Sequence, residues 1–430
     1  MSRSPKKQIE SIVRSLENRG VPAAPVVEAT ALATSHPEAV SDLAIAVMRR
    51  FPKGGTFLDG AFSYLPQGRW PELVRVALDT LEVSGGKNDA AASVIEYASL
   101  QCPSALHAHL DRIFLIRPNA RCYYECYPWR ESGDQHLDFL RSVIEGTTST
   151  EEDRRRAWKA LCETRHAKAI EYALSCADSV APSDWSREKW VHAHLHLVGF
   201  HRENQSLRRT CPDSLYHLQF PDGFFDPQSR PPWLARVHPT WQLPESVQAV
   251  PFGGRGAGRC SLCAGALHRL LLLDPIPPGL GVTGLTRLEL ATCLSCLGWE
   301  RQPLFYRHDE DGSPRNVGYD GPPVSPQFPA HPLREAEVGL ARTPRRSFWQ
   351  AWGCSNSREN LNRVGGEPCW IQDAEYPSCP TCNKVMPYLF QLDSDLPTAD
   401  GGEWLWGSGG IAYWFWCDGC RFSGVFWQCT

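Results

Sequence analysis

Four Cys-x-x-Cys pairs lie within the last 171 residues of this 430-residue chain, and they constrain its fold more than any other feature. The pairs are Cys260 and Cys263, Cys293 and Cys296, Cys379 and Cys382, and Cys417 and Cys420. Two such pairs supply the four thiolates of one tetrahedral zinc site. The sequence therefore predicts two structural Zn²⁺ ions, held by these eight cysteines in a zinc-ribbon-like arrangement.

The cysteine pairs belong to an internal repeat. The segment CSLCAGALHRLLLLD from Cys260 aligns without a gap with CPTCNKVMPYLFQLD from Cys379, so that the cysteines, several apolar positions and the final Asp coincide. Each segment then runs through a loop into a strand-like stretch that ends in a second pair. We expect a duplicated unit over residues 260–305 and 347–430. The pairs are separated by more residues than in usual ribbons, so pairing within each unit and crossed pairing between units both remain open.

The start of the chain bears on whether these cysteines form disulfides. Its first twenty residues are charged and amphipathic and lack the apolar core of a secretory signal. No stretch of the sequence approaches the length of about 18 apolar residues that a membrane span needs. We therefore expect a cytoplasmic protein without a membrane partner, in which the cysteine spacing serves metal and not disulfides.

The same cysteines argue against catalysis. Complete four-thiolate sets leave no open position for water, so both metals are predicted to be structural. The sequence has no zinc-deaminase signature, phosphate loop, dinucleotide fingerprint or nucleophile elbow, and we expect no catalytic or cofactor-binding residues. The enzyme alternative requires an open metal site in which His268 or His308 replaces a thiolate.

Residues 1–205 are predicted to be helical. Seven segments carry apolar residues at helical spacing and are separated by glycine or proline. Helix pairs of this kind predict a HEAT-like repeat, whose surface usually binds proteins, or alternatively an irregular bundle that supports the C-terminal half.

A histidine-rich stretch, HAHLHLVGFH, lies near the end of this half and contains His192, His194, His196 and His201. Residues four apart share a helix face, so His192 and His196 could ligate one metal. No acidic third ligand follows at a diagnostic spacing, and we interpret these side chains as ordinary helix histidines.

The remaining segments are richer in proline. Residues 206–259 are predicted to be an aromatic, proline-rich connector, and residues 306–346 a linker between the two metal-binding units. With helices first and a β-rich half after them, the predicted fold class is α+β.

The net charge of the C-terminal part of the chain bears on whether its partner is a nucleic acid. Residues 251–430 contain 15 Lys and Arg against 18 Asp and Glu, a formal charge of −3. Binding to phosphates needs a basic surface, so this balance argues against nucleic acid. The tryptophans of the last segment, Trp404, Trp406, Trp414 and Trp416, alternate as strand residues do, which favours core packing over base stacking.

Several short strings of the last segment, in this order, resemble the YwqG-like family. They are RVGGEPCWIQ (363–372), LFQLD (389–393), GGIAYWF (409–415) and a final Gln428-Cys429. The resemblance covers about residues 350–430, and residues 251–305 more weakly. It implies a β-rich fold, no established catalytic activity, and a bacterial cytosolic protein, some members acting as immunity factors against toxins.

Together these observations predict a non-enzymatic, zinc-stabilised factor that binds another protein. A bacterial immunity protein whose partner is a toxin is one such factor. The alternative is a zinc-ribbon protein associated with nucleic acid, which would need a basic face assembled from dispersed arginines.

Overall fold

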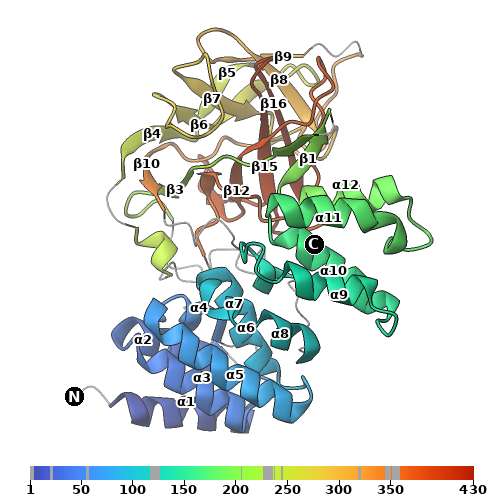
Figure 1. Cartoon of the computed structure of the whole chain (residues 1–430). Coiled ribbons are helices and arrows are strands. Elements are labelled where there is room, and N and C mark those ends of the chain that lie inside the picture. Colours follow the sequence, from blue (N-terminus) through green and yellow to red (C-terminus); the bar gives the residue numbers. More distant parts are fainter. Residues whose placement is uncertain are drawn as a thin grey trace. The chain divides into compact units, whose positions relative to one another are not determined.

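The structure is a computed structural model that describes residues 4–19, 23–54, 58–116, 126–204, 206–225, 236, 238–243, 246–317, 321–343, 350 and 359–430. It has a helical N-terminal half and a C-terminal half built on an antiparallel sheet, which confirms the α+β class (Figure 1). The chain divides into two compact units, the first ending at Val198 and the second beginning at Gly199. Each unit is described by itself below.

The helices of the first unit follow one another with short connections. They are α1 (Pro5–Arg19), α2 (Ala23–Ser35), α3 (Ala39–Arg50), α4 (Asp59–Phe62), α5 (Trp70–Ser84), α6 (Asp89–Gln101), α7 (Ser104–His107), α8 (Leu110–Ile116), α9 (Leu137–Glu145), α10 (Glu151–Glu163), α11 (Ala167–Cys176) and α12 (Arg187–Leu197). Helices adjacent in sequence pack together: α1 with α2, α5 with α6, α9 with α10, and α10 with α11. Such local pairing is what a stacked helix array requires.

Local sequence signals explain where these helices begin and end. Helix α5 ends at Gly85, whose φ of 59° is left-handed and suits glycine. Helix α6 begins after Asn88, whose side chain accepts a hydrogen bond from the Ala91 backbone N–H. Helix α10 begins with a capping box between Thr150 and Asp153. Helix α2 is not predicted by the apolar spacing of the sequence. Its residues, AAPVVEATALATS, are apolar around most of the helix circumference and show no clear helical period.

The strands lie mainly in one sheet of the second unit. They are β1 (Phe200–Glu203), β2 (Ser206–Arg209), β3 (Leu215–Gln219), β4 (Gln248–Phe252), β5 (Arg255–Arg259), β6 (Ala266–Leu273), β7 (Leu288–Thr292), β8 (Leu304–His308), β9 (Pro314–Asn316), β10 (Ala336–Arg342), β11 (Arg363–Gly365), β12 (Tyr388–Asp393), β13 (Leu396–Pro397), β14 (Glu403–Trp404), β15 (Ile411–Cys417) and β16 (Phe422–Gln428). Strands β1 and β2 form a separate two-stranded ribbon, as do β13 and β14.

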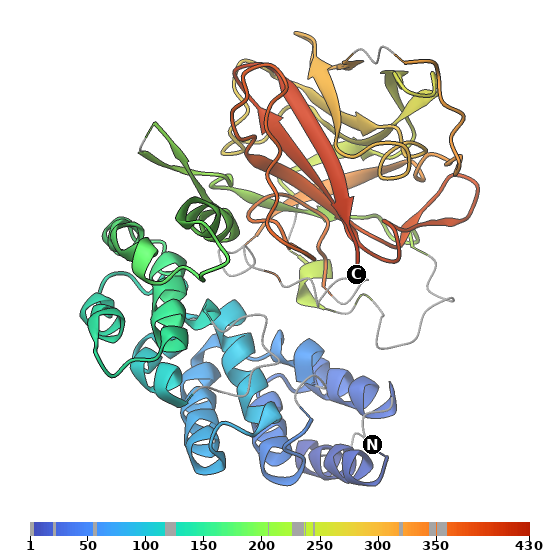
Figure 2. The same ribbon diagram turned by 90° about the vertical axis from the view of Figure 1, so that its right-hand side faces the viewer.

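The main sheet has 12 strands in the order β5-β6-β4-β10-β3-β11-β12-β15-β16-β8-β9, with β7 also paired to β6. The longest run of paired residues joins β15 and β16, which run side by side in Figure 2. The two ends of this order, β5 and β9, contact each other, so the sheet curves back on itself. At this junction a Cβ added at Gly258 would lie 3.2 Å from the carbonyl oxygen of Pro314.

The two segments expected to be connectors contribute strands to this sheet. The described part of 206–259 includes β3 and β4, and the described part of 306–346 includes β9 and β10. Strand β10 pairs with β3 on one side and with β4 on the other. The frequent prolines in and around these strands explain why the sequence indicated connectors, since proline is unusual within a sheet.

Both faces of the central strands are covered. Along β15, Ala412, Trp414 and Trp416 join a large core on one face, whereas Ile411, Tyr413 and Phe415 join a smaller core on the other. Trp406, Trp414 and Trp416 are buried and Trp404 packs against the large core, as their alternation predicted. In the part of the chain that the structure describes, no helix has the length and apolar character needed to cross a membrane.

Strand β11 ends in a double glycine whose backbone conformation only glycine adopts readily. Gly365 has a φ of 77°, and a Cβ added there would lie 2.0 Å from the carbonyl oxygen of Ser214. We expect Gly365→Ala to lower the free energy of unfolding by about 2–3 kcal/mol or more, through backbone strain and displacement of β3. Urea denaturation of the purified protein measures this. The control is Gly419→Ala, since an added Cβ there meets no atom within 4 Å; equal effects of the two changes would contradict the argument.

Candidate metal centres and a buried polar row

The first four-cysteine group lies at one end of the β6–β7 pair. Cys260 and Cys263 form the turn that precedes β6, and Cys293 and Cys296 follow β7 directly. Because β6 and β7 are antiparallel, the start of one strand lies beside the end of the other. The four Sγ atoms are all within 4.8 Å of one another, and the Sγ atoms of Cys263 and Cys293 are 3.7 Å apart.

The second group repeats this arrangement on β12 and β15. Cys379 and Cys382 precede β12, Cys417 is the last residue of β15, and Cys420 lies in the turn before β16. The four Sγ atoms again lie within 4.8 Å of one another. The Sγ atoms of Cys382 and Cys417, which correspond to Cys263 and Cys293 in the repeat, are also 3.7 Å apart.

The backbones of the two leading turns match closely. In both turns the N–H of the first cysteine donates to the carbonyl five residues later at 2.8 Å, and the residue after the second cysteine donates to the first cysteine's carbonyl at 2.9 Å. The residues after the second cysteines, Ala264 and Asn383, have left-handed φ values of 58° and 56°. In the first turn, N–H groups of Leu262 and Gly265 also point at cysteine sulfurs, both at 3.4 Å. Such donors stabilise thiolates that bind metal.

The strands that follow also share an irregularity. Strand β6 bulges opposite β7 between Arg269 and Leu271, and β12 bulges opposite β15 between Tyr388 and Phe390. These positions differ by 119 residues, as Cys260 and Cys379 do (379 − 260 = 119). The repeat inferred from sequence is therefore a repeat of structure.

This geometry decides between the two arrangements that the sequence left open. Each unit closes its own group, because the antiparallel strand pair brings the two cysteine pairs of that unit together. Crossed pairing is excluded. Neither histidine of the enzyme alternative belongs to a group: His268 Nδ1 accepts the Leu294 N–H at 3.1 Å, and His308 hydrogen-bonds the Ser423 hydroxyl at 2.8 Å.

The donor set fits a metal that binds four sulfurs tetrahedrally. A tetrahedron with metal–sulfur bonds of about 2.3 Å has edges of about 3.8 Å, close to the 3.7 Å observed in both groups. Both groups can therefore hold a metal ion without rearrangement of the strands.

In the histidine-rich stretch, His192, His194 and His196 lie on α12, and His201 lies on β1. The rings of His192 and His196 have centroids 3.9 Å apart and are tilted by 48° to each other. His194 packs between Trp158 and Trp190, and burial lowers its pKa to about 4. Among the residues that the structure describes, none of these histidines belongs to a group of three possible metal ligands.

A row of buried polar side chains crosses the face of the main sheet that carries the smaller core. His217 on β3 pairs directly with Arg363 on β11, Arg363 pairs with Gln391 on β12, and Gln391 pairs with Tyr413 on β15. Their side chains are all 0 % exposed. The row has one residue per strand at successive registers, so it crosses four adjacent strands.

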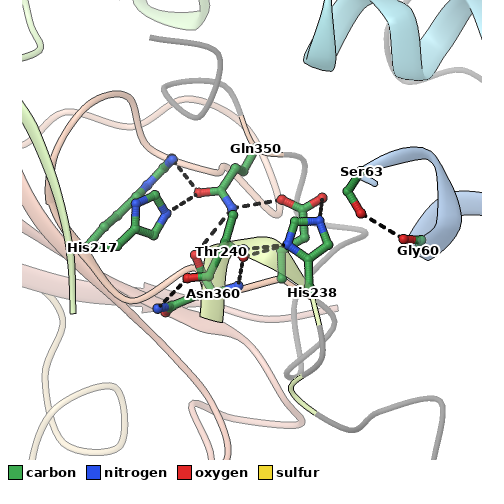
Figure 3. A network of polar contacts seen from close by, with 9 residues as sticks. Gly60, Ser63, His217, His238, Thr240, Gln350 and Asn360 are labelled. Carbon is green, nitrogen blue, oxygen red and sulfur yellow. Dashed lines mark hydrogen bonds and ion pairs between the residues drawn. The ribbon is translucent and has the colours of Figure 1, made fainter. Parts of the chain in front are cut away.

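Polar groups of the segments that lie over the sheet form hydrogen bonds with the side chains of this row. Cys369 lies over it: its N–H donates to Gln391 Oε1 at 3.0 Å and its carbonyl accepts from Tyr413 Oη at 2.6 Å. Arg363 Nη1 donates to Gln350 Oε1 at 2.7 Å, and Arg363 Nη2 donates to Cys369 Sγ at 3.1 Å. Gln350 in turn contacts His217 at 2.9 Å (Figure 3). The network fastens the segment around Cys369 to the sheet.

A second branch of the network contains a threonine, a histidine and a glutamate. Thr240 Oγ1 is 2.7 Å from His238 Nδ1, and His238 Nε2 is 3.4 Å from Glu359 Oε1. The same His238 Nδ1 accepts the Thr240 N–H at 3.1 Å, and Thr240 Oγ1 accepts the Asn360 N–H at 2.8 Å (Figure 3). These are the bonds of a helix cap and a loop anchor.

The sequence analysis did not single out this row as a network. Its signals were weak: Gln391 interrupts the apolar string LFQLD, and Arg363 begins the string RVGG. A charged residue at the start of a short strand reads as exposed, because the covering segment comes from elsewhere in the chain.

One consequence of the row is a pH-dependent contribution to stability. Burial, and then the charge of Arg363, lower the pKa of His217 to about 3. The pKa in the unfolded chain is about 6.5. The unfolded state therefore binds the proton first, and stability is lost as the pH falls from about 6.5 toward 3, by about 1.4 kcal/mol per pH unit.

His217→Gln should reduce this slope relative to the unchanged protein. Urea denaturation at pH 6.5 and at pH 5 measures it, and cysteine protonation at the metal centres affects both proteins alike. Identical slopes would show that His217 is not held neutral by the fold.

Comparison with known proteins gives one distant relative. Over 273 residues, 58 % of this chain, the sequence is 25 % identical to "Uncharacterized protein YpfL" of Salmonella typhimurium. The matched region is 53 % of that protein, so the chain spans about half of its length. No family model matches the chain, and no solved structure matches it. The YwqG-like resemblance therefore stays a prediction.

Proposed function

We propose that this chain is a zinc-stabilised factor that binds another protein and has no catalytic activity of its own. Four cysteine sulfurs within 4.8 Å of one another suit Zn²⁺ in preference to hard cations, which take oxygen ligands. The observation that carries the proposal is that each four-cysteine group is complete within its own strand pair. A metal with four thiolate ligands has no position left for water or substrate, so its role is to hold strands together.

Support for protein binding comes from the helical unit. Val83 at the end of α5 is 92 % exposed, and Leu115 on α8 is 71 % exposed. The two helices pack together, and Arg112 of α8 binds Asp79 and Glu82 of α5. Val83 follows Glu82, and Leu115 lies one turn after Arg112. We take these two side chains as the proposed apolar centre of the interface, with the neighbouring charged groups at its polar rim.

The test is purification of the tagged chain from its native host at moderate salt. We expect a protein to copurify at near-stoichiometric amounts and to elute with the chain in size-exclusion chromatography. Val83→Asp with Leu115→Asp should abolish this complex, because charges would replace its apolar contacts. Leu197→Asp, at an exposed position of α12 that is 48 % accessible, is the matched control and should leave it intact.

We further propose that the partner is a toxin and that this chain is its immunity protein. Expression of the partner alone should arrest growth of the host, and coexpression of this chain should restore it. A partner without toxicity would leave a protein-binding factor but remove the immunity role. Nuclease-sensitive nucleic acid in place of a protein would favour the zinc-ribbon alternative and overturn the proposal.

A further inference from the structure

The leading turns and the following strands of the two metal centres have matching backbone conformations. The centres differ in how well they are covered. In the first centre Cys260, Cys293 and Cys296 are buried and Cys263 is half-buried. In the second centre Cys379 and Cys417 are also buried, but Cys420 is half-buried and Cys382 is exposed. Since the repeat superposes their strands, turns and bulges, the difference comes from what packs on them.

A proline-rich segment, here called the proline strap (residues 321–332), covers the first centre. The Val324 N–H donates to the carbonyl of Leu262, between Cys260 and Cys263, at 2.8 Å. The Ala330 N–H donates to the hydroxyl of Ser295, which lies between the other two ligands, at 2.9 Å. The strap thus bonds to the same position of both Cys-x-x-Cys turns.

Further contacts hold the strap between these two points. The Gln327 N–H donates to Glu300 Oε1 at 3.0 Å, and the ring of Phe328 lies 4.6 Å from that of Trp299. Val324 and Ala330 also pack against the large core. The strap is therefore part of the folded unit along its length.

The second centre lacks this cover in the described part of the chain. The positions equivalent to Leu262 and Ser295 are Thr381 and Gly419, and both are exposed, whereas Leu262 and Ser295 are buried. A Cβ added at Gly419 would meet no atom within 4 Å. At these two positions the second centre is therefore more open to a soluble ligand than the first, although Asp418 beside Gly419 accepts hydrogen bonds from Thr283.

We propose that the second centre is an exchange site, which passes its metal to and from small thiol or polydentate ligands in solution, while the first centre keeps its metal. The thiolate or carboxylate of the incoming ligand forms a bond to the metal as the bond to Cys382 breaks. Cys382 leaves as a thiolate and takes a proton from solvent, so no atom changes its oxidation state. The occupancy of the second centre then follows the available metal, and the stability of β12 and β15 follows that occupancy.

This inference rests on the metal-binding part of the proposed function. Metal analysis after loading with excess zinc comes first: fewer than two equivalents bound at saturating zinc would refute the zinc proposal itself. With two equivalents bound, excess EDTA is added to the intact zinc-loaded chain, and freed cysteines are trapped over time with N-ethylmaleimide and located by mass spectrometry.

One equivalent should leave at least about tenfold faster than the other, since thiolate reactivity follows access. The early labels should fall on Cys379, Cys382, Cys417 and Cys420. A single common rate, or earlier labelling of the first centre, would overturn the exchange proposal and leave the zinc proposal standing.

The strap offers a variant that tests the cause. Val324→Pro removes the N–H that bonds to Leu262, and it should accelerate release from the first centre without changing the second. Ser325→Ala, at the exposed neighbouring position, keeps that N–H and should leave both rates unchanged. If Val324→Pro changes neither rate, the strap does not protect the first centre.

Discussion

Replacing Cys379 and Cys382 by serine is expected to remove one of the two metal equivalents and to destabilise the β12–β15 strand pair. Both ligands belong to one group, so the group at Cys260 keeps all its sulfurs. A structural zinc site contributes on the order of 10 kcal/mol to folding, and the strands it joins are central in the sheet. We therefore expect a large fall in melting temperature, measured by calorimetry together with metal analysis.

A second variant makes the same experiment sensitive to pairing. Cys260→Ser with Cys379→Ser removes one ligand from each group and should lower the affinity of both groups for metal. The first variant should affect one group alone. Cys429→Ser is the control, because Cys429 lies outside both groups. If the Cys379 and Cys382 variant kept native metal content and melting temperature, the structural role of that centre would be wrong.

Arg363→Met is expected to lower the free energy of unfolding by about 3–5 kcal/mol, because it leaves buried acceptors without a donor. The guanidinium is fully buried and donates to Gln350 Oε1, to the Glu367 carbonyl and to Cys369 Sγ. Methionine matches its volume but supplies no N–H group. Urea denaturation of the metal-loaded protein gives the difference directly.

Two matched variants separate the network from the mere loss of charge. Arg363→Lys keeps the charge but not the planar fork, so it should recover only part of the lost stability. Arg307→Met removes an exposed arginine of β8 in the same sheet and should change stability by no more than about 0.5 kcal/mol. An Arg363→Met variant as stable as Arg307→Met would show that the polar row does not hold the sheet.

The metal ligands could be read from the sequence because the signal is local. A Cys-x-x-Cys turn has the same spacing wherever it occurs, and the ungapped repeat from Cys260 and Cys379 predicted two equivalent turns. The structure adds the matching left-handed residues Ala264 and Asn383. The helix ends at Gly85 and Thr150 follow local rules in the same way.

The polar row was less accessible because its members come from distant parts of the chain. His217 and Arg363 are adjacent only because β3 pairs with β11. Strand β10, which pairs with β3 and β4, was hidden in a segment whose prolines indicated a linker. Neither of these strand pairings can be predicted from the spacing of residues along the sequence.

The eight cysteines of the two four-sulfur groups, the α+β class and the duplication could all be predicted from the sequence alone. Each of these depends on contacts within a turn, a helix or one repeat, where spacing along the chain sets the geometry. The structure was needed to show that each unit closes its own four-cysteine group, that a polar row crosses four strands, and that the strap packs on one group and leaves Cys382 of the other exposed. Those properties depend on which strands pair and on where a remote segment packs, and the sheet brings together residues far apart in the chain.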